Sequence, residues 1–185
     1  MNVVVIPDGA MIIVPFIEKN GHTYLSPTNF SKYDNELNLN IDFDNLINSY
    51  LSSEVPSGVR GRISLLAPVL KKADAAIILG SRPPYYKSMY NVLNELILFC
   101  GKGCINAHSL AIKILSELNI PILKLAYPTT RSEIINLIER VNLFLKNLDT
   151  LDNRTVNDYS LNVDLVNKSD KVPFNEFKKI LNKTF

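Results

Sequence analysis

The sequence predicts an α/β fold, a three-layer Rossmann-like domain with a mainly parallel sheet of four or five strands. Short runs of β-branched and other apolar residues alternate along the chain with segments whose apolar residues recur at helical spacing. Strands that alternate with helices form parallel sheets through right-handed crossovers. The strand runs are apolar on both faces, which is typical of strands buried between two layers of helices.

The first βαβ unit begins at the second residue. The apolar run Asn2–Ile6 predicts the first strand. A helix is expected over Ala10–Lys19, with Asp8 as an N-cap candidate and Pro15 kinking the helix or restricting it to its later turns. The second strand is expected over His22–Leu25.

In the middle of the chain, the sequence indicates secondary structure weakly over residues 26–54 and clearly after them. Residues 26–54 are rich in Asn and Asp and indicate an excursion over the sheet, with one helix near Phe43–Leu51. A further helix is expected over Arg60–Lys72, where apolar residues recur at helical spacing, and it leads into a third strand at Ala75–Leu79. The segment Tyr85–Cys100 predicts a helix with one apolar face.

The last strands and helices follow the same alternation. Cys104–Asn106 is interpreted as a short strand, before a helix over His108–Leu118. Pro121–Tyr127 predicts the last strand of the sheet. Thr130 and Glu133 have the spacing of a capping box, which predicts the start of a long helix.

The α/β domain is expected to span residues 1–148. The remainder, residues 149–185, begins with a stretch rich in Asn and Asp that has no periodicity and predicts a polar linker. After Pro173 apolar residues return at helical spacing, which predicts a short amphipathic C-terminal helix. We expect this helix to dock on its own domain, with a protein partner as the alternative.

Composition limits the classes of function. The 185 residues are 46% hydrophobic and 21% charged, which is enough to bury a core without disulfides or metals. A formal charge of +2 is too small to indicate a general nucleic-acid binder. Pro7 and Asp8 interrupt the apolar start of the chain, so we expect neither a signal peptide nor a membrane span. The sequence therefore predicts a cytoplasmic protein without nucleic-acid or membrane partners, and leaves homo-oligomerisation open.

The chain has two cysteines, Cys100 and Cys104. A pair with this spacing and no further cysteine cannot complete a zinc or iron–sulfur site within one chain. We expect two reduced, partly buried thiols, with a redox pair or a cluster shared with a second chain as the alternatives. The sequence thus predicts no metal site, and it leaves the cofactor unknown.

The candidate site lies at the carboxyl ends of the strands, where parallel sheets bind ligands and helix N-termini present free N–H groups. Two glycine-containing segments there carry arginines, Ser57–Arg62 and Gly80–Arg82. Guanidinium groups beside accessible backbone suit a carboxylate or a phosphate. The alternatives are a flexible surface loop and a strand-to-helix turn, each with solvated arginines.

Catalytic signals are incomplete. The glycine spacings fit neither the phosphate-binding P-loop nor the dinucleotide fingerprint. His108 and Asp8 have the chemistry of a general acid or base, but the sequence shows no paired nucleophile, and structural roles are the alternative. Catalytic residues therefore stay unknown. The predicted ligand-binding residues are Asp8, Ser57, Gly58, Arg60, Arg62, Gly80, Ser81, Arg82, His108 and Arg131.

Four segments resemble the methanogenesis marker protein 5 family of methanogenic archaea: VVVIPDGAMIIVPFIEKNGH, VPSGVRGR, ADAAIILGSRPPYY and IPILKLAYPTTRSEIINLIERVNLFL. The resemblance covers about residues 1–148 and implies a cytoplasmic protein of a strict anaerobe, with no activity assigned. By association with other marker proteins, it implies an accessory role in maturing or activating methyl-coenzyme M reductase. The last strand and helix also resemble the closing βα unit of 2-hydroxyacyl-CoA dehydratase subunits, although this chain has too few cysteines for their iron–sulfur cluster.

These observations leave competing functions. The leading expectation is an accessory protein that binds an anionic small molecule, or a protein partner of the methanogenesis machinery, through Arg60, Arg62 and Arg82. The alternative is a small enzyme, for example a transferase or hydrolase, acting on a phosphorylated or carboxylated metabolite with His108 or Asp8 as acid or base. A redox role for the two cysteines is the third reading.

Overall fold

The computed structural model describes residues 1–8, 10, 12–29, 56–80, 105–128, 130–148 and 174–184. These residues form a four-stranded parallel sheet, five helices and a helical turn at residues 27–29, which confirms the expected α/β fold. The strands are β1 (Asn2–Ile6), β2 (Thr23–Leu25), β3 (Ala75–Leu79) and β4 (Ile122–Leu125). The helices are α1 (Val14–Lys19), α4 (Ser57–Lys71), α6 (Ile105–Glu117), α7 (Arg131–Asn147) and α8 (Phe174–Thr184).

The strand order is β2-β1-β3-β4. From β1 the chain crosses to β2 on one side, and from β2 it returns past β1 to β3 on the other side. The connections therefore reverse direction between β1 and β3, where Ile6 lies opposite Ile78. Flavodoxin-like doubly wound sheets begin with the same strand order.

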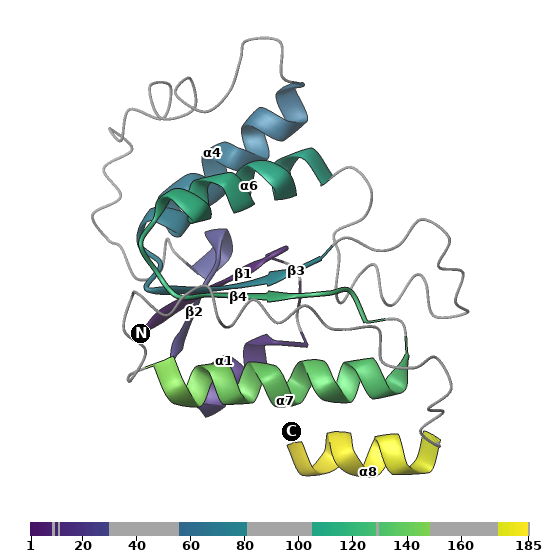
Figure 1. The fold of residues 1–185 in the computed structure, drawn as a ribbon. Coiled ribbons are helices and arrows are strands. Elements are labelled where there is room, and N and C mark those ends of the chain that lie inside the picture. The colour runs from purple at the N-terminus through teal and green to yellow at the C-terminus, as the bar shows by residue number, and fades with distance from the viewer. Residues whose placement is uncertain are drawn as a thin grey trace.

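Helices cover both faces of the sheet. Helices α1 and α7 lie on one face and α4 and α6 on the other (Figure 1). Alternate residues of the central strands point into the two cores, with Val5 packing in the α1–α7 core and Val4 in the α4–α6 core. The sheet is buried from both sides because side chains alternate in direction along each strand.

The start of α7 confirms the predicted capping box. The Glu133 backbone N–H donates to Thr130 Oγ1 at 3.2 Å, and the Thr130 backbone N–H donates to Glu133 Oε2 at 3.1 Å. The two bonds satisfy backbone donors that a helix start leaves without partners. This local signal fixes where the helix begins after β4.

Helix α1 is restricted to the later turns of the predicted Ala10–Lys19 segment, as Pro15 indicated, but its start is not capped as predicted. The helix begins at Val14, its N-cap position is Ile13, and no side chain caps it. Pro15 lies in the first turn, where its missing N–H costs no helical hydrogen bond. The expected N-cap role of Asp8 for this helix is therefore wrong.

The helix predicted over Arg60–Lys72 begins three residues earlier, because α4 starts at Ser57. The flexible surface loop that was the alternative for Ser57–Arg62 is therefore wrong. Val59 and Ile63 are buried in the α4–α6 core, and their burial outweighs the low helix propensity of Gly58 and Gly61.

Residues 105 and 106 belong to α6 rather than to a strand. The short strand predicted over Cys104–Asn106 is therefore wrong at these two positions. Ala107 is buried at 1% exposure in the core between α4 and α6, so packing against the neighbouring helix favours the helical start.

Helix α8 forms near the C-terminus and contacts α7 on the side away from the sheet (Figure 1). Within the ranges described above, no helix is both long and apolar enough to cross a membrane. The helices predicted near Phe43–Leu51 and Tyr85–Cys100, the linker over residues 149–170, and both cysteines lie outside the described residues. The division of the chain at residue 148 stays a prediction.

Candidate functional site

Two strands end side by side where the strand connections reverse direction. Asp8 comes two residues after Ile6 of β1, and Gly80 comes two residues after Ile78 of β3. Ile6 and Ile78 are paired in the sheet, so β1 and β3 end next to each other. Ligands of doubly wound sheets bind at this reversal point, beyond the carboxyl ends of the strands.

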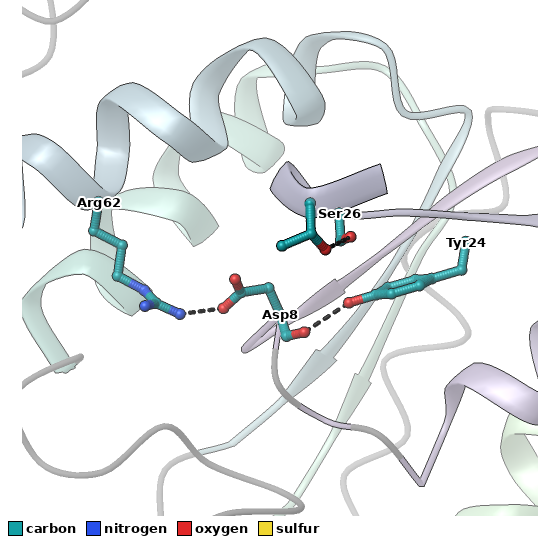
Figure 2. A network of polar contacts seen from close by, with 5 residues as sticks. Asp8, Tyr24, Ser26 and Arg62 are labelled. Atoms are coloured by element: carbon teal, nitrogen blue, oxygen red, sulfur yellow. Dashed lines mark hydrogen bonds and ion pairs between the residues drawn. The ribbon is translucent and has the colours of Figure 1, made fainter. Parts of the chain in front are cut away.

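Arg62 of α4 forms an ion pair with Asp8, with Nη2 donating to Oδ1 (Figure 2). The C-terminus of α4 leads directly into the start of β3, so its N-terminal half lies toward the carboxyl edge of the sheet. The Arg62 and Asp8 side chains remain 31% and 23% exposed. A ligand can therefore reach both charged groups.

Tyr24 supports the Asp8 loop from the neighbouring strand. Its buried ring directs the hydroxyl group at the loop, where it donates to the Asp8 carbonyl oxygen at 2.6 Å (Figure 2). This bond joins the end of β2 to the segment after β1. The backbone of Asp8 is thereby held in place while its side chain contacts Arg62.

Ser26 shapes the same edge after β2. Its side-chain oxygen accepts the Asn29 backbone N–H at 3.2 Å and lies 2.9 Å from Thr28 Oγ1. Ser26 is 5% exposed, so these contacts satisfy a buried hydroxyl group. The pattern of Ser followed by Pro27 is typical of a helix start and points to Ser26 in the sequence, whereas no sequence signal points to Tyr24.

Gly80 lies where β3 and β4 approach closely. Its backbone N–H donates to the Leu125 carbonyl oxygen at 2.7 Å. An added Cβ atom would lie 3.3 Å from that oxygen and 3.4 Å from the Tyr127 backbone nitrogen. Close backbone approach therefore accounts for the glycine. Ser81 and Arg82 lie outside the described residues, so their ligand role stays a prediction.

His108 is the fourth residue of α6 and is 9% exposed. The helix leads through a short connection into the start of β4, so its N-terminal turns lie toward the carboxyl edge of the sheet. Burial lowers the pKa of His108 below its usual value of 6.5. The imidazole is therefore neutral at pH 7 and retains the lone pair that a general base needs.

The other predicted ligand-binding residues that the structure describes on helices belong to α4 and α7. Ser57 and Gly58 are exposed in the first turn of α4, and Arg60 is half-buried one turn before Ser64. Arg131 is the first residue of α7, which covers the opposite face of the sheet and follows a strand two positions from β1. Two strand spacings are about 10 Å, so Arg131 lies apart from the Asp8–Arg62 pair.

His22 has a structural contact. Its Nε2 atom lies 2.9 Å from the Leu145 carbonyl oxygen, and the ring is buried. Since a carbonyl oxygen only accepts hydrogen bonds, Nε2 carries the proton. The bond joins the start of β2 to the end of α7.

The site offers charge and hydrogen bonding. In the part of the chain that the structure describes, no three His, Cys, Asp or Glu side chains group closely enough to hold a metal ion. A guanidinium group oriented by a carboxylate is a forked donor for carboxylates and phosphates. The arrangement is suited to binding an anion.

Comparison with known proteins gives two matches. A family model described as "Uncharacterized protein conserved in archaea (DUF2112)" matches residues 1–148. An uncharacterized protein of Methanocaldococcus jannaschii is 31% identical over 154 residues, which cover 77% of this chain and 92% of the relative. No solved structure matches the chain.

Proposed function

The chain belongs to this family of uncharacterised proteins conserved in archaea, and from that premise we propose that it binds an anionic small molecule with Arg62 as the anchor. The observation that carries the proposal is the partly exposed Asp8–Arg62 pair at the carboxyl edge of the sheet. Anionic ligands favour such an edge because strand ends and helix N-termini direct N–H groups toward it.

Arg62 has two properties of an anion anchor. It belongs to the second turn of α4, close to the helix N-terminus, whose free N–H groups attract anions. Its contact with Asp8 keeps the guanidinium group at the reversal point between β1 and β3. A pre-oriented side chain loses less conformational entropy when a ligand binds.

The wider role in this proposal is that of an accessory protein of methanogenesis in the cytoplasm. Its support is the resemblance of four segments to methanogenesis marker protein 5 and the relative in Methanocaldococcus jannaschii. Maturation or activation of methyl-coenzyme M reductase is the proposed process. In this reading a protein partner delivers or receives the anionic ligand.

Anion binding is tested by replacing Arg62→Ala and titrating the protein with glycerol 3-phosphate by calorimetry. We expect affinity to fall about tenfold or more, which corresponds to loss of one charge-assisted contact. Lys71→Ala is the matched control, because it removes the same charge from the exposed far end of the same helix. Equal affinities of Arg62→Ala and the wild-type protein would reject the anchor.

The accessory role is tested separately by affinity purification of the tagged protein from an anaerobically grown methanogen. We expect methyl-coenzyme M reductase or its maturation factors to co-purify. The tagged Arg62→Ala protein is the control bait, because it differs from the wild-type bait only at the proposed anion site. Recovery of the folded protein without these partners would contradict the accessory role and leave the anion site in place.

A small enzyme is the second candidate, and the neutral, buried His108 favours it. A neutral imidazole beside a bound metabolite is suited to general-base catalysis. Phosphate release from 4-nitrophenyl phosphate and from sugar phosphates should then fall at least tenfold in His108→Gln. Absence of turnover in the wild-type protein would count against an enzyme that hydrolyses phosphate esters.

A further inference from the structure

We propose that Asp8 selects the ligand, so that the site takes a small organic anion carrying hydroxyl groups beside its charged group. This inference rests on the proposed anion site and deepens it. Arg62 would hold the phosphate or carboxylate, and Asp8 would accept hydrogen bonds from the neighbouring hydroxyl groups. The pair would thus recognise a two-part ligand rather than a bare anion.

A bare anion is a poor ligand here. Asp8 contacts Arg62 directly, so an anion bound to the guanidinium group comes close to the Asp8 carboxylate. Like charges at short distance repel, and this repulsion is larger beside a protein surface than in bulk water. The anion would also compete with Asp8 for the same guanidinium donors.

Hydroxyl groups change this balance. An ionised carboxylate only accepts hydrogen bonds, and a hydroxyl group is the simplest ligand donor for it. A hydrogen bond to a charged acceptor is stronger than one between neutral groups. A ligand that presents an anion to Arg62 and a hydroxyl group to Asp8 would therefore replace both halves of the ion pair.

The surroundings keep Asp8 in position for this contact. The Tyr24 hydroxyl group holds the Asp8 carbonyl oxygen at 2.6 Å, and the preceding strand is paired on both sides. The Asp8 side chain extends from this fixed backbone toward Arg62 (Figure 2). A carboxylate held in this way can discriminate between ligands of similar size.

The test compares propyl phosphate with glycerol 3-phosphate, which differ by two hydroxyl groups, on the wild-type protein and on Asp8→Ala. We expect the wild-type protein to bind glycerol 3-phosphate about tenfold more tightly, as one strong hydrogen bond would give. In Asp8→Ala this preference should disappear. Propyl phosphate should bind more tightly to the variant, since Arg62 is released from Asp8.

Propionate and glycerate form the corresponding carboxylate pair, and they show whether the charged group is a phosphate or a carboxylate. A preference that persists in Asp8→Ala would overturn the inference. The inference would also be overturned if Asp8→Ala gained, or lost, the same amount of affinity for both members of each pair. Failure of the folded wild-type protein to bind any of the four probes at about 10 mM would overturn it too.

These outcomes are separable from those of the proposed function. If Arg62→Ala abolishes binding but Asp8→Ala changes both members of a pair by the same factor, the anion site stands and the selection by Asp8 fails. If Arg62→Ala leaves binding unchanged, the anion site itself fails.

Discussion

One aspartate lies beside the amino end of β1 and another follows its carboxyl end, and the two aspartates have different contacts. At the amino edge, Asp74 Oδ2 accepts the Asn2 backbone N–H at 2.7 Å, and the Asp74 backbone N–H donates to the Asn2 carbonyl oxygen at 2.8 Å. At the carboxyl edge, Asp8 contacts the side chain of Arg62, 54 residues away. The first aspartate bonds to the backbone N–H and carbonyl groups of Asn2, and the second is joined to a charged side chain.

This difference has a physical basis. A backbone bond at a strand end continues the pattern of the sheet and leaves little for a ligand to replace. An ion pair of partly exposed side chains is weak in water and can exchange partners at small cost. The contacts at the amino ends of the strands therefore add to stability, whereas the Asp8–Arg62 pair at the carboxyl ends is the contact that the proposed ligand would replace.

The largest expected effect is at the close approach of β3 and β4. Gly80→Val should lower the free energy of unfolding by about 2 kcal/mol, because the added atoms meet backbone atoms that cannot move aside easily. Urea denaturation measures the change. Gly61→Ala is the matched control, since nothing lies within 4 Å of its added Cβ atom, and the helix should gain about 0.5–1 kcal/mol. Equal stability of the two variants would contradict the close packing at the carboxyl edge.

A smaller effect is expected from Tyr24→Phe. The substitution removes the donor to the Asp8 carbonyl oxygen, and the free energy of unfolding should fall by about 1 kcal/mol. Thermal and urea denaturation measure stability, and calorimetry with glycerol 3-phosphate measures binding. Because the Asp8 loop loses its support, affinity should fall together with stability. Unchanged affinity would show that Asp8 keeps its position without Tyr24.

The stability of the folded protein should depend on pH through His108. Burial lowers the pKa of His108 in the folded protein, so below about pH 6.5 the unfolded chain binds the proton more readily than the folded one. This contribution to stability is complete above about pH 6.5, is lost as the pH falls toward the folded pKa, and then levels off. His108→Gln should flatten the pH dependence of the free energy of unfolding over that range. Parallel curves for the variant and the wild-type protein would contradict a neutral, buried imidazole.

The smallest changes in the free energy of unfolding are expected from substitutions of the two aspartates. Asp74→Ala should lower the free energy of unfolding by about 0.5 kcal/mol, because its acceptor lies at an exposed position, and it should leave phosphate binding unchanged. Asp8→Ala should alter ligand preference with a similarly small effect on stability. Denaturation measures stability and calorimetry measures binding for both variants. Altered binding in Asp74→Ala would contradict a purely structural role for Asp74.

The sequence predicted the parts of the fold that have local causes. The runs that form β1 and β3 are apolar throughout, and Thr130 with Glu133 marks the start of α7 in the chain itself. The start of α4 was missed because Gly58 and Gly61 resemble a loop, whereas the burial of Val59 decides the outcome. Propensity is a weak guide when packing against a distant segment competes with it.

The candidate site was predicted in part for the same reason. The carboxyl edge follows from the alternation of strands and helices, so Asp8 and Arg62 were both in the predicted set. Their pairing depends on how α4 crosses the sheet, which no local pattern encodes. Tyr24 was missed because its contact is with a backbone carbonyl oxygen, and such a contact leaves no signature in residue type.

The position of Met1 at the amino ends of the strands is useful for attaching the protein to a surface. Met1 is 46% exposed, and its carbonyl oxygen accepts the Thr23 backbone N–H at the start of β2. The N-terminus therefore lies at the amino end of β1 (Figure 1), and Asp8 follows the opposite end of that strand. A sensor chip or bead that captures the protein through an N-terminal tag would orient the molecule with its charged edge toward the solution, where it can meet ligand.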